Sequence, residues 1–264
     1  RGLPGTIPAA VSGLRAGFSM PLPRHAYLDI PSAIFYNKYV FCWIGVVLSV
    51  LTVLNRSHDP FYNQAFEEYV FQAFPSDDVF LLWVNDPAVV VGSHQNICRE
   101  VHVETLRRLG IPVVRRITGG GTVYHDLGNV NYTIIRNGSP YDRDYASFIA
   151  PVTETLRSLG IPADLSGESD IAVDGLKVSG SAQRAAHGRV MHHATLLYSS
   201  DLDALRTLTR GRRAWFTTKG TASKPAPVTN MRDHMASPFA SADDFLHAFT
   251  DALTQRLGAH HGTL

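Results

Sequence analysis

Three consecutive glycines, at positions 119–121, interrupt a stretch whose flanks favour β-structure, with Val113 and Val114 before them and residues 130–135 after them. Glycine weakens a strand because it has no side chain to pack, so three in a row indicate a bulge or a group lying close to the backbone. Arg115 and Arg116 precede the run. A main chain with free N–H groups beside two cations suits an anionic ligand such as a nucleotide phosphate. A glycine-rich hairpin with surface arginines is the alternative.

The complete run from Arg115 to Asn129 resembles the signature of lipoate–protein ligases and lipoyltransferases, Arg-Arg-x-x-Gly-Gly-Gly-x-Val-Tyr/Phe-His-Asp-x-Gly-Asn, which wraps the adenylate. Two later blocks also match that family. Residues 175–182 resemble its lysine loop, and residues 192–197 resemble its His-His-Gly-Thr-Leu-Leu strand, with Ala194 in place of the glycine. The resemblance extends from about Ser49 to about Gly258, with the blocks in the family's order.

Short predicted strands alternate with hairpin turns more often than with crossover helices, which favours an α+β fold over a doubly wound one. We expect a mixed, largely antiparallel sheet with flanking helices. The resemblance implies the same fold, shared with the catalytic domains of biotin–protein ligases and class II aminoacyl-tRNA synthetases.

Capping and stop signals locate the helices. Asp59 followed by Pro60 predicts a helix start, and the residues that then recur at helical spacing are expected to face the core: Tyr62, Ala65, Phe66, Tyr69, Val70 and Ala73. Further helices are predicted at 103–109 and 152–159, each closed by Gly-Ile-Pro, and after Ser241.

Strands are predicted at 80–84, 89–91, 130–136 and 193–198. Asp174-Gly175 predicts a hairpin turn directly before the lysine loop. Residues 210–230 are rich in Arg, Lys, Thr, Ser and Pro, and they are predicted to form a mobile loop.

The expected domains are an N-terminal extension (residues 1–46), a catalytic domain (47–258) and a short tail (259–264). The first 28 residues contain three arginines and no acid, as targeting segments do, although their prolines oppose an amphipathic helix. The expected compartment is the cytoplasm, or the mitochondrion if the extension is a transit peptide. A processed product, a fragment and an upstream start are all consistent with the first residue, Arg1.

The apolar run from Tyr39 to Leu54 has sixteen residues, fewer than the roughly 20 of a membrane span. Its second half, from Val46, is expected to be a buried strand; a membrane anchor is the alternative. Composition indicates an ordinary globular protein, with 45% hydrophobic and 18% charged residues. The net charge of +1 argues against a nucleic-acid partner. Two cysteines, Cys42 and Cys98, make no disulfide framework.

Lys177 is one of four lysines in the chain, and Gly175 and Gly180 flank it. A compact ammonium can bridge the oxygens of a carboxylate and a phosphate. An exposed hairpin lysine is the plain alternative, and the resemblance implies the catalytic role. Arg115 and Arg116 are expected to clamp phosphates through bidentate contacts, although one of them could form a structural ion pair instead.

The resemblance implies a nucleotide and lipoyl-AMP site made of Arg115, Arg116, Gly119, Gly120, Gly121, Val123, Tyr124, Asn129, Asp170, Gly180, Ser181 and Thr195. It implies an acyl pocket made of Gly92, Gln95, Asn96, His192 and His193, although residues 92–96 could be a strand-exit turn.

Asp170 is the candidate ligand for Mg²⁺, which needs only one or two carboxylates, or an acceptor for the adenine or ribose. His125 and Asp126 point to opposite faces of an extended chain, so structural hydrogen bonds are expected of them. His192 and His193 lack the spacing of a zinc site.

The resemblance implies activation of lipoate by ATP to lipoyl-AMP, then transfer to a lysine of a lipoyl domain. The implied acceptors are 2-oxo acid dehydrogenase complexes and the glycine cleavage H protein. Octanoyl transfer without ATP is one alternative, disfavoured because no cysteine lies near the lysine loop. A non-catalytic lipoate-binding subunit is another. Single-chain ligases carry an accessory domain after the catalytic one, and only residues 259–264 follow here, so a separate accessory chain is an expected partner.

Overall fold

The computed structural model describes residues 50–74, 77–138, 144–209 and 217–257, and the backbone of three short strands before them: β1 (Ala33–Tyr36), β2 (Phe41–Trp43) and β3 (Val46–Leu48). The rest of the predicted N-terminal extension and the whole predicted tail lie outside the described residues. The predicted domain boundaries therefore stay predictions.

The main sheet has eight strands in the order β1-β4-β5-β9-β13-β12-β11-β10. Its further members are β4 (Val50–Asn55), β5 (Asp78–Val84), β9 (Asn129–Asn137), β10 (Ala163–Ser166), β11 (Asp170–Val173), β12 (Leu176–Ala186) and β13 (Arg189–Leu197). Every pairing in this sheet is antiparallel except that of β4 with β5. The predicted α+β class with a mixed, largely antiparallel sheet is confirmed.

A second, three-stranded sheet has the order β7-β6-β8 and carries the glycines at one end. It consists of β6 (Ala88–Val91), β7 (Val113–Arg115) and β8 (Val123–His125). The stretch between β7 and β8, residues 116–122, is called the glycine loop below. This small sheet holds both ends of the loop in fixed strands.

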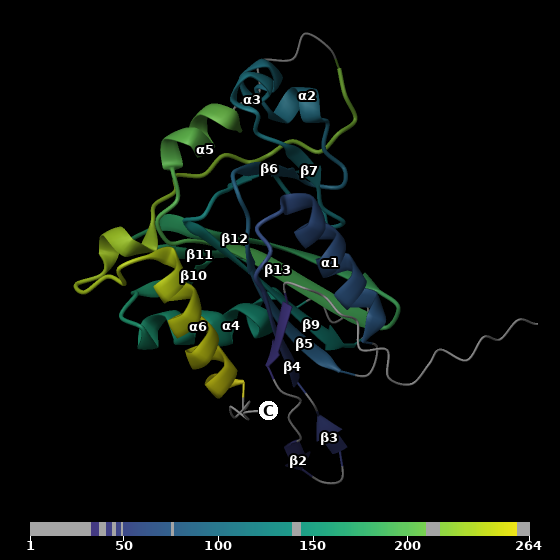
Figure 1. Cartoon of the computed structure of the whole chain (residues 1–264), viewed down its shortest axis with the longest axis vertical. Helices are drawn as coiled ribbons and strands as arrows, with labels where there is room; N and C mark the ends of the chain where they lie inside the picture. The colour runs from purple at the N-terminus through teal and green to yellow at the C-terminus, as the bar shows by residue number, and fades with distance from the viewer. Residues whose placement is uncertain are drawn as a thin grey trace, which may run out of the picture. The chain divides into compact units, whose positions relative to one another are not determined.

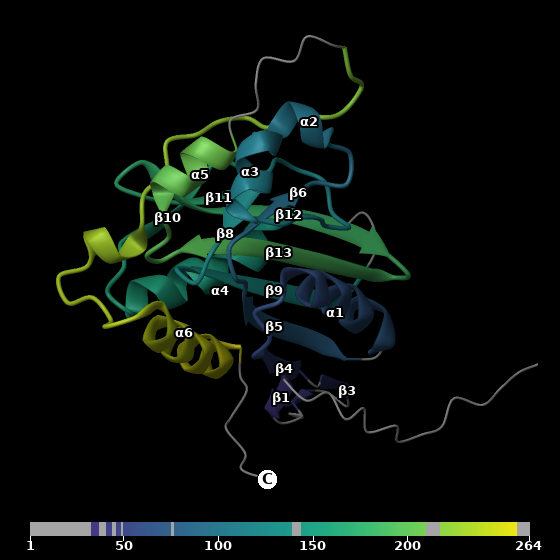
Figure 2. The same cartoon turned by 45° about the horizontal axis from the view of Figure 1, so that its top comes forward.

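Helices cover both faces of the main sheet (Figures 1 and 2). α1 (Pro60–Ala73) lies on one face and connects β4 to β5, as parallel neighbours require a crossover. α4 (Tyr145–Ser158) and α6 (Ala242–Arg256) pack on the other face around Phe80, Tyr132 and Phe249. Because both faces are covered, β5 and β9 are buried at almost every position, which explains the nearly continuous apolar sequence of β5.

Short helices flank the small sheet: α2 (Ile97–Glu100), α3 (Val103–Leu109) and α5 (Leu202–Leu208), and a 3₁₀ turn, η1 (Met231–His234), precedes α6. The predicted caps are confirmed. Asp59 accepts from the N–H groups of Phe61 and Tyr62 at 2.8 and 3.1 Å, and Gly110 ends α3 with φ +66°.

The predicted helix at 152–159 was placed too late, because α4 begins at Tyr145 after the cap Asp144 and contains Pro151. Proline removes one helical N–H donor, so the carbonyl four residues earlier needs another partner. That carbonyl belongs to Ser147, and it accepts from Arg136 Nη1 at 3.4 Å. A donor from outside the helix thus compensates for the proline.

The predicted core face of α1 is partly wrong. Phe66 and Val70 are buried as expected, but Tyr69 is 42% exposed. Buried polar residues take part of the inner face instead: Asn63, Gln64 and Glu67. Their polar partners come from distant strands, which sequence spacing does not reveal.

The apolar run before residue 55 forms strands where it is described, namely β2, β3 and β4, and Val53 and Leu54 are buried. Among the described residues, no helix is long and apolar enough to cross a membrane.

Candidate active site

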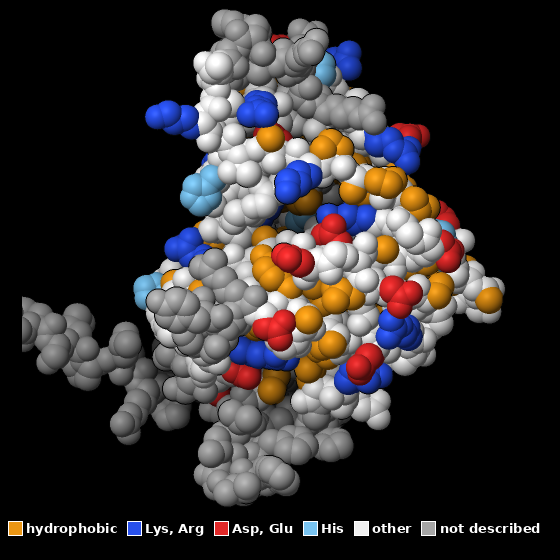
Figure 3. Space-filling model, turned by 180° about the vertical axis from the view of Figure 1, so that it is seen from behind, with side chains coloured by type: hydrophobic (Ala, Val, Ile, Leu, Met, Phe, Trp, Pro, Cys, Tyr) orange, Lys and Arg blue, Asp and Glu red, His pale blue; other side chains and the backbone are white. Residues whose placement is uncertain are grey.

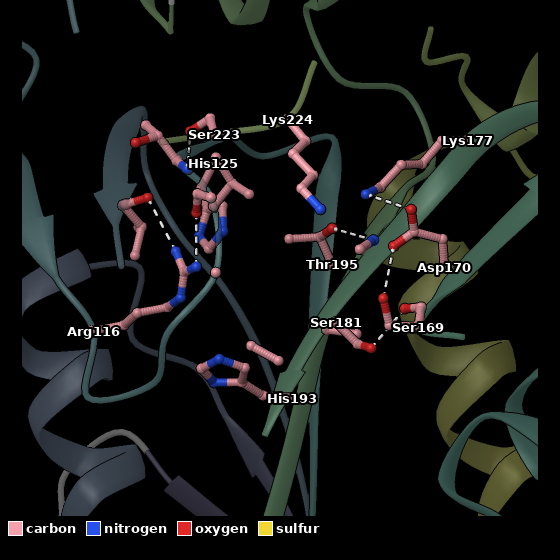
Figure 4. A pocket seen from close by; sticks show the side chains of 18 of the residues that line it. Arg116, His125, Ser169, Asp170, Lys177, Ser181, His193, Thr195, Ser223 and Lys224 are labelled. Carbon is pink, nitrogen blue, oxygen red and sulfur yellow. Dashed lines mark hydrogen bonds and ion pairs between the residues drawn. The ribbon is translucent and has the colours of Figure 1, made fainter. Parts of the chain in front are cut away.

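A cavity of about 460 Å³ lies where the glycine loop, β12, β13 and residues 217–230 meet (Figure 4). Residues 217–230 are called the site loop. The lining side chains come from stretches far apart in the sequence: Gln64, Trp83, Val90, Arg116, His125, Asn131, Asp170, Lys177, His193, Thr195 and Lys224 are among them. This volume is typical of small-molecule sites. On the face shown in Figure 3, basic, acidic and histidine side chains gather around a hollow near the centre.

Lys177 follows the hairpin turn at Asp174 and Gly175, whose φ values of +50° and +76° confirm the predicted left-handed turn. Its Nζ lies 2.8 Å from Asp170 Oδ2, and both side chains are 30% exposed. A Cβ at Gly180 would come within 3.0 Å of Lys177 Nζ. Because Gly180 has no side chain, it leaves space for the Lys177 side chain to extend from β12 to Asp170 on the neighbouring strand β11.

Hydroxyl groups surround this ion pair (Figure 4). Ser181 Oγ donates to the carbonyl of Ser169 at 2.6 Å, and Thr195 Oγ1 accepts from the N–H of Gly180 at 3.3 Å. The part of the cavity around Lys177 and Asp170 is thus polar, and the opposite charges of these two side chains balance each other.

Arg116 is buried beneath the glycine loop. Its Nη2 donates to the carbonyls of Gly119 and Gly121 at 2.6 and 2.7 Å, and its Nε donates to Thr118 Oγ1 at 3.0 Å. Burial lowers the pKa of Arg116 to about 10, so it stays charged at neutral pH. These bonds hold the loop carbonyls on the arginine. Among the described residues, none accepts from the N–H of Gly120 or Gly121.

A buried polar chain supports the loop from below. His193 Nε2 lies 2.7 Å from Thr118 Oγ1, and His193 Nδ1 lies 2.9 Å from Glu67 Oε1. Glu67 also accepts from Thr133 Oγ1 at 2.5 Å. The Glu67 carboxylate can only accept, so His193 Nδ1 carries a proton that faces it, and the Thr118 hydroxyl meets the other ring nitrogen. Glu67 is not among the predicted site residues, because its only sequence signal is an acid on the apolar side of α1.

Part of the cavity wall is apolar and consists of Trp83, Val90, Ala182 and Ala194. His125 also lines it. Burial, helped by Arg116 and His193, lowers the pKa of His125 to about 3, so this imidazole is neutral.

Asn85 Nδ2 lies 3.0 Å from His125 Nδ1, while Asn85 Oδ1 accepts from Asn63, so Asn85 donates and His125 Nδ1 accepts. The Nε2–H of His125 is then a buried donor without a partner among the described residues. Asp126, as predicted, makes structural bonds, accepting from the N–H groups of Gly128 and Asp201 at 2.9 and 2.7 Å.

A second cavity of about 700 Å³ shares a wall with the first. Lys177, Thr195 and Lys224 line both cavities. The remaining wall of the second cavity is largely apolar and includes Tyr124, Leu176, Leu197, Leu205, Arg206 and Val228. Lys177 therefore lies where the two cavities meet, which is called the junction below.

The predicted mobile loop at 210–230 is only partly described, because residues 210–216 lie outside the described residues. The described part, the site loop, is tied down at several points. Lys177 donates its N–H to the carbonyl of Pro227 and accepts from the N–H of Thr229, both at 3.0 Å. Ser223 accepts from the N–H of Thr122 and from Gln95 Nε2, each at 2.9 Å.

Ten of the predicted site residues line the first cavity: Arg116, Gly120, Gly121, Val123, Asp170, Lys177, Gly180, Ser181, His193 and Thr195. Tyr124 lines the second cavity. The others do not line the first cavity: Arg115, Gly119, Asn129, Gly92, Gln95, Asn96 and His192.

Arg115 does not face the cavity. Its Nη1 donates to the carbonyls of Gly92 and Gln95 at 2.7 and 3.0 Å, so it stabilises the turn after β6. A Cβ at Gly92 would lie 2.4 Å from the carbonyl oxygen of Gly120, so this turn packs against the back of the glycine loop. Asn96 Nδ2 donates to Thr218 Oγ1 at 3.3 Å and thereby contacts the site loop.

His192 and Asn129 lie away from the predicted positions. His192 is on the opposite face of β13 from His193, where it stacks on Phe148 at 5.2 Å, and burial lowers its pKa to about 3. Asn129 Nδ2 donates to Asn131 Oδ1 at 3.0 Å, and it is Asn131 that lines the cavity.

Residues 59–254 match the family model described as the lipoyl protein ligase A/B catalytic domain. The chain is 37% identical to lipoate-protein ligase LplJ of Bacillus subtilis over 180 residues, which cover 67% of this chain and 54% of that protein. It is 37% identical to lipoate–protein ligase 1 of Staphylococcus aureus over 187 residues, covering 70% of this chain and 57% of that one. The chain thus spans about half the length of these relatives.

Solved structures show the same fold. A lipoate-protein ligase A bound with ATP superposes with a TM-score of 0.63 at 25% identity, over 81% of this chain and 87% of that chain. A bipartite lipoate protein ligase of Thermoplasma acidophilum, described with its E2 lipoyl domain, superposes with a TM-score of 0.63 at 24% identity, over 76% of this chain and 80% of that chain.

Proposed function

Because the chain belongs to the family of lipoyl protein ligase A/B catalytic domains, we propose that it attaches lipoate to lysine residues of lipoyl domains. In the first step a lipoate carboxylate oxygen attacks the α-phosphorus of ATP, and the bond to the β-phosphate breaks to release pyrophosphate. In the second step the lysine amine attacks the lipoyl carbonyl carbon. The bond to the phosphate oxygen then breaks, the amine loses a proton, and AMP leaves.

The observation that carries the proposal is the position of Lys177 between two cavities. The first has an apolar stretch of wall and the polar groups around Lys177, which suits a carboxylate on a hydrocarbon chain. The second, with its largely apolar remaining wall, suits the flat faces of a nucleotide base. The carboxylate and the α-phosphate would then meet beside the Lys177 ammonium. A fixed cation there stabilises the charge that develops as they react.

The glycine loop would bind phosphate oxygens through its main chain. The carbonyls of Gly119 and Gly121 are held by Arg116. The N–H groups of Gly120 and Gly121 remain for a ligand, and successive free N–H groups form an anion-binding nest. Arg116 therefore acts through the loop rather than as a phosphate clamp.

Mg²⁺ would arrive with ATP, and Asp170 is the carboxylate that would meet it. One carboxylate with phosphate oxygens and waters is a donor set that Mg²⁺ accepts, so the residue fits the role. Asp170 Oδ1 lies 3.5 Å from Ser169 Oγ, a weak contact that leaves this oxygen for a ligand. The described residues hold no cluster of three or more His, Cys, Asp or Glu that would bind a metal without the nucleotide. A bound Mg²⁺ would neutralise phosphate charge.

A covalent thioester route is not favoured. Cys98 is the free cysteine among the described residues, and it lies on α2, outside the lining of both cavities. An octanoyltransferase of that type needs a nucleophile beside the acyl group.

The proposed acceptors are lipoyl domains of 2-oxo acid dehydrogenase complexes and the glycine cleavage H protein. The bipartite ligase described with its E2 lipoyl domain supports this class of partner, and it also supports a separate accessory chain as a second partner.

The test supplies the purified chain with an apo lipoyl domain and either ATP plus lipoate or preformed lipoyl-AMP. We expect lipoylated domain from lipoyl-AMP, and pyrophosphate release that depends on lipoate when ATP is given. The lipoyl-AMP reaction measures transfer separately from activation. Acyl transfer from an octanoyl carrier protein without ATP would support the rival enzyme, and no transfer from any donor would support a binding subunit.

A further inference from the structure

We propose that Lys224 is a second phosphate-binding cation, supplied by the site loop for the β- and γ-phosphates of ATP. This inference rests on the proposed function and deepens it, because it names the residue that binds the leaving pyrophosphate.

Lys224 lines both cavities, together with Lys177 and Thr195. In Figure 4 its side chain extends from the site loop toward Thr195, while Lys177 approaches from the other side and contacts Asp170. The residue itself is exposed, so solvent reaches the junction beside Lys224. The β- and γ-phosphates are the most strongly hydrated part of ATP, and this is the side on which they would project.

The charges that line the two cavities are otherwise engaged. Lys177 pairs with Asp170 at 2.8 Å, and Arg206 pairs with Asp203 at 2.8 Å. Arg116 donates its hydrogen bonds to Thr118 and to carbonyls of the glycine loop. Lys224, in contrast, has no ion pair or hydrogen bond with any described residue. A triphosphate brings several negative charges to the junction, and Lys224 is the lining cation that can offer all its donors to them.

Ser223, the residue before Lys224, fixes the position of the Lys224 backbone. Glu100, only 5% exposed, accepts from both the N–H and the Oγ of Ser223, at 3.1 and 2.5 Å. Gln95 and the glycine loop at Thr122 bind the same hydroxyl. The chain just before Lys224 is thus attached to the glycine loop, while its flexible side chain is left to reach the ligand.

The test measures binding of ATP, AMP and adenosine by calorimetry to the unmodified chain and to Lys224→Gln, Lys224→Arg and Arg108→Gln. Arg108 is exposed on α3 and lines neither cavity, so its variant controls for the loss of one positive charge. For Lys224→Gln we expect at least tenfold weaker ATP binding and less than twofold change for AMP and adenosine. Lys224→Arg should keep most of the ATP affinity, and Arg108→Gln should change none of the three.

Equal ATP affinity in the unmodified chain and in Lys224→Gln would overturn the inference while leaving the proposed function intact. So would an equal loss for ATP and adenosine, since adenosine has no phosphate. If the unmodified chain binds ATP no more tightly than adenosine, both the inference and the proposed function fail. In the activation assay, Lys224→Gln should raise the KM for ATP by about the same factor as the loss of affinity and leave transfer from lipoyl-AMP within twofold.

Discussion

Lys177 and Asp170 form an ion pair that is partly open to solvent, so neither side chain is needed to fill the core. We expect Lys177→Ala to leave the melting temperature within about 2 °C, because exposed ion pairs contribute little to stability. Lipoate-dependent pyrophosphate release should fall by roughly 10²–10³-fold, the usual effect of removing one donor that stabilises a developing anion. Lys177→Arg should restore only part of the rate, because the guanidinium is larger and planar. Near-normal release by the alanine variant would exclude Lys177 from the chemistry.

Gly120 combines a φ of +90° with a close neighbour, since a Cβ there would lie 2.9 Å from Arg116 Nη2. Gly110 has a φ of +66° and nothing within 4 Å of its Cβ position, which makes it a matched control. Both Gly→Ala variants should lose about 1–2 kcal/mol of unfolding free energy from backbone strain. Only Gly120→Ala should also weaken ATP and lipoyl-AMP binding, which calorimetry measures. Equal binding by the two variants would reduce the glycine run to a structural turn.

At the scale of elements, the site loop is less mobile than its local sequence predicts, because distant residues hold it. Its composition predicts mobility, yet Ser223 joins it to Glu100, Gln95 and Thr122. We expect Ser223→Ala to raise the KM for ATP by about tenfold, because these hydrogen bonds position the loop over the junction. Glu100 loses its hydroxyl partner, so the unfolding free energy should fall by about 1–3 kcal/mol in urea titrations. Ser223→Thr keeps the hydroxyl and should retain most of the affinity; a Thr variant as weak as Ala would contradict this role.

Elements set by local chemistry were predicted well from the sequence. The cap at Asp59, the left-handed turn at Asp174-Gly175 and the stop at Gly110 each depend on a few adjacent residues, and the structure confirms all three. The predicted helix at 152–159 missed the start of α4, because the helix continues through Pro151 and the compensating donor, Arg136, lies on β9.

Site residues were predictable only where their role depends on the local chain. Strand alternation explains why His193 lines the cavity and His192 does not. Arg115 could not be assigned to its carbonyl partners, because the turn that it stabilises is about twenty positions earlier. Glu67 and Lys224 were missed because their partners are joined only by the tertiary fold.

For the whole molecule, two buried neutral histidines make the free energy of unfolding decrease at low pH. The folded-state pKa values of His125 and His192 are lowered to about 3, against about 6.5 in the unfolded chain. Below about pH 6.5 the unfolded state therefore binds protons that the folded state excludes. Their contribution to stability is complete above that pH and is lost as the pH falls toward 3, by up to about 1.4 kcal/mol per pH unit for each histidine.

Urea unfolding between about pH 5.5 and 4 measures this slope. His192→Phe should reduce the slope by roughly 1.4 kcal/mol per pH unit, because one proton-binding group disappears from the unfolded chain. The phenyl ring can keep the stacking on Phe148, while Gln183 and Tyr132 each lose one hydrogen bond. An unchanged slope would show that His192 is protonated in the folded protein.

Two main-chain hydrogen bonds join Lys177 to the site loop, so hydrogen–deuterium exchange measures directly how often this site opens. The amide hydrogens of Lys177 and Thr229 each form one of these hydrogen bonds, so neither can exchange while the loop is in place. Their exchange rates report how often the loop leaves β12, with no ligand, acceptor or chemical step involved. Peptides containing these two amides should exchange slowly and in parallel, and both should exchange faster in Ser223→Ala.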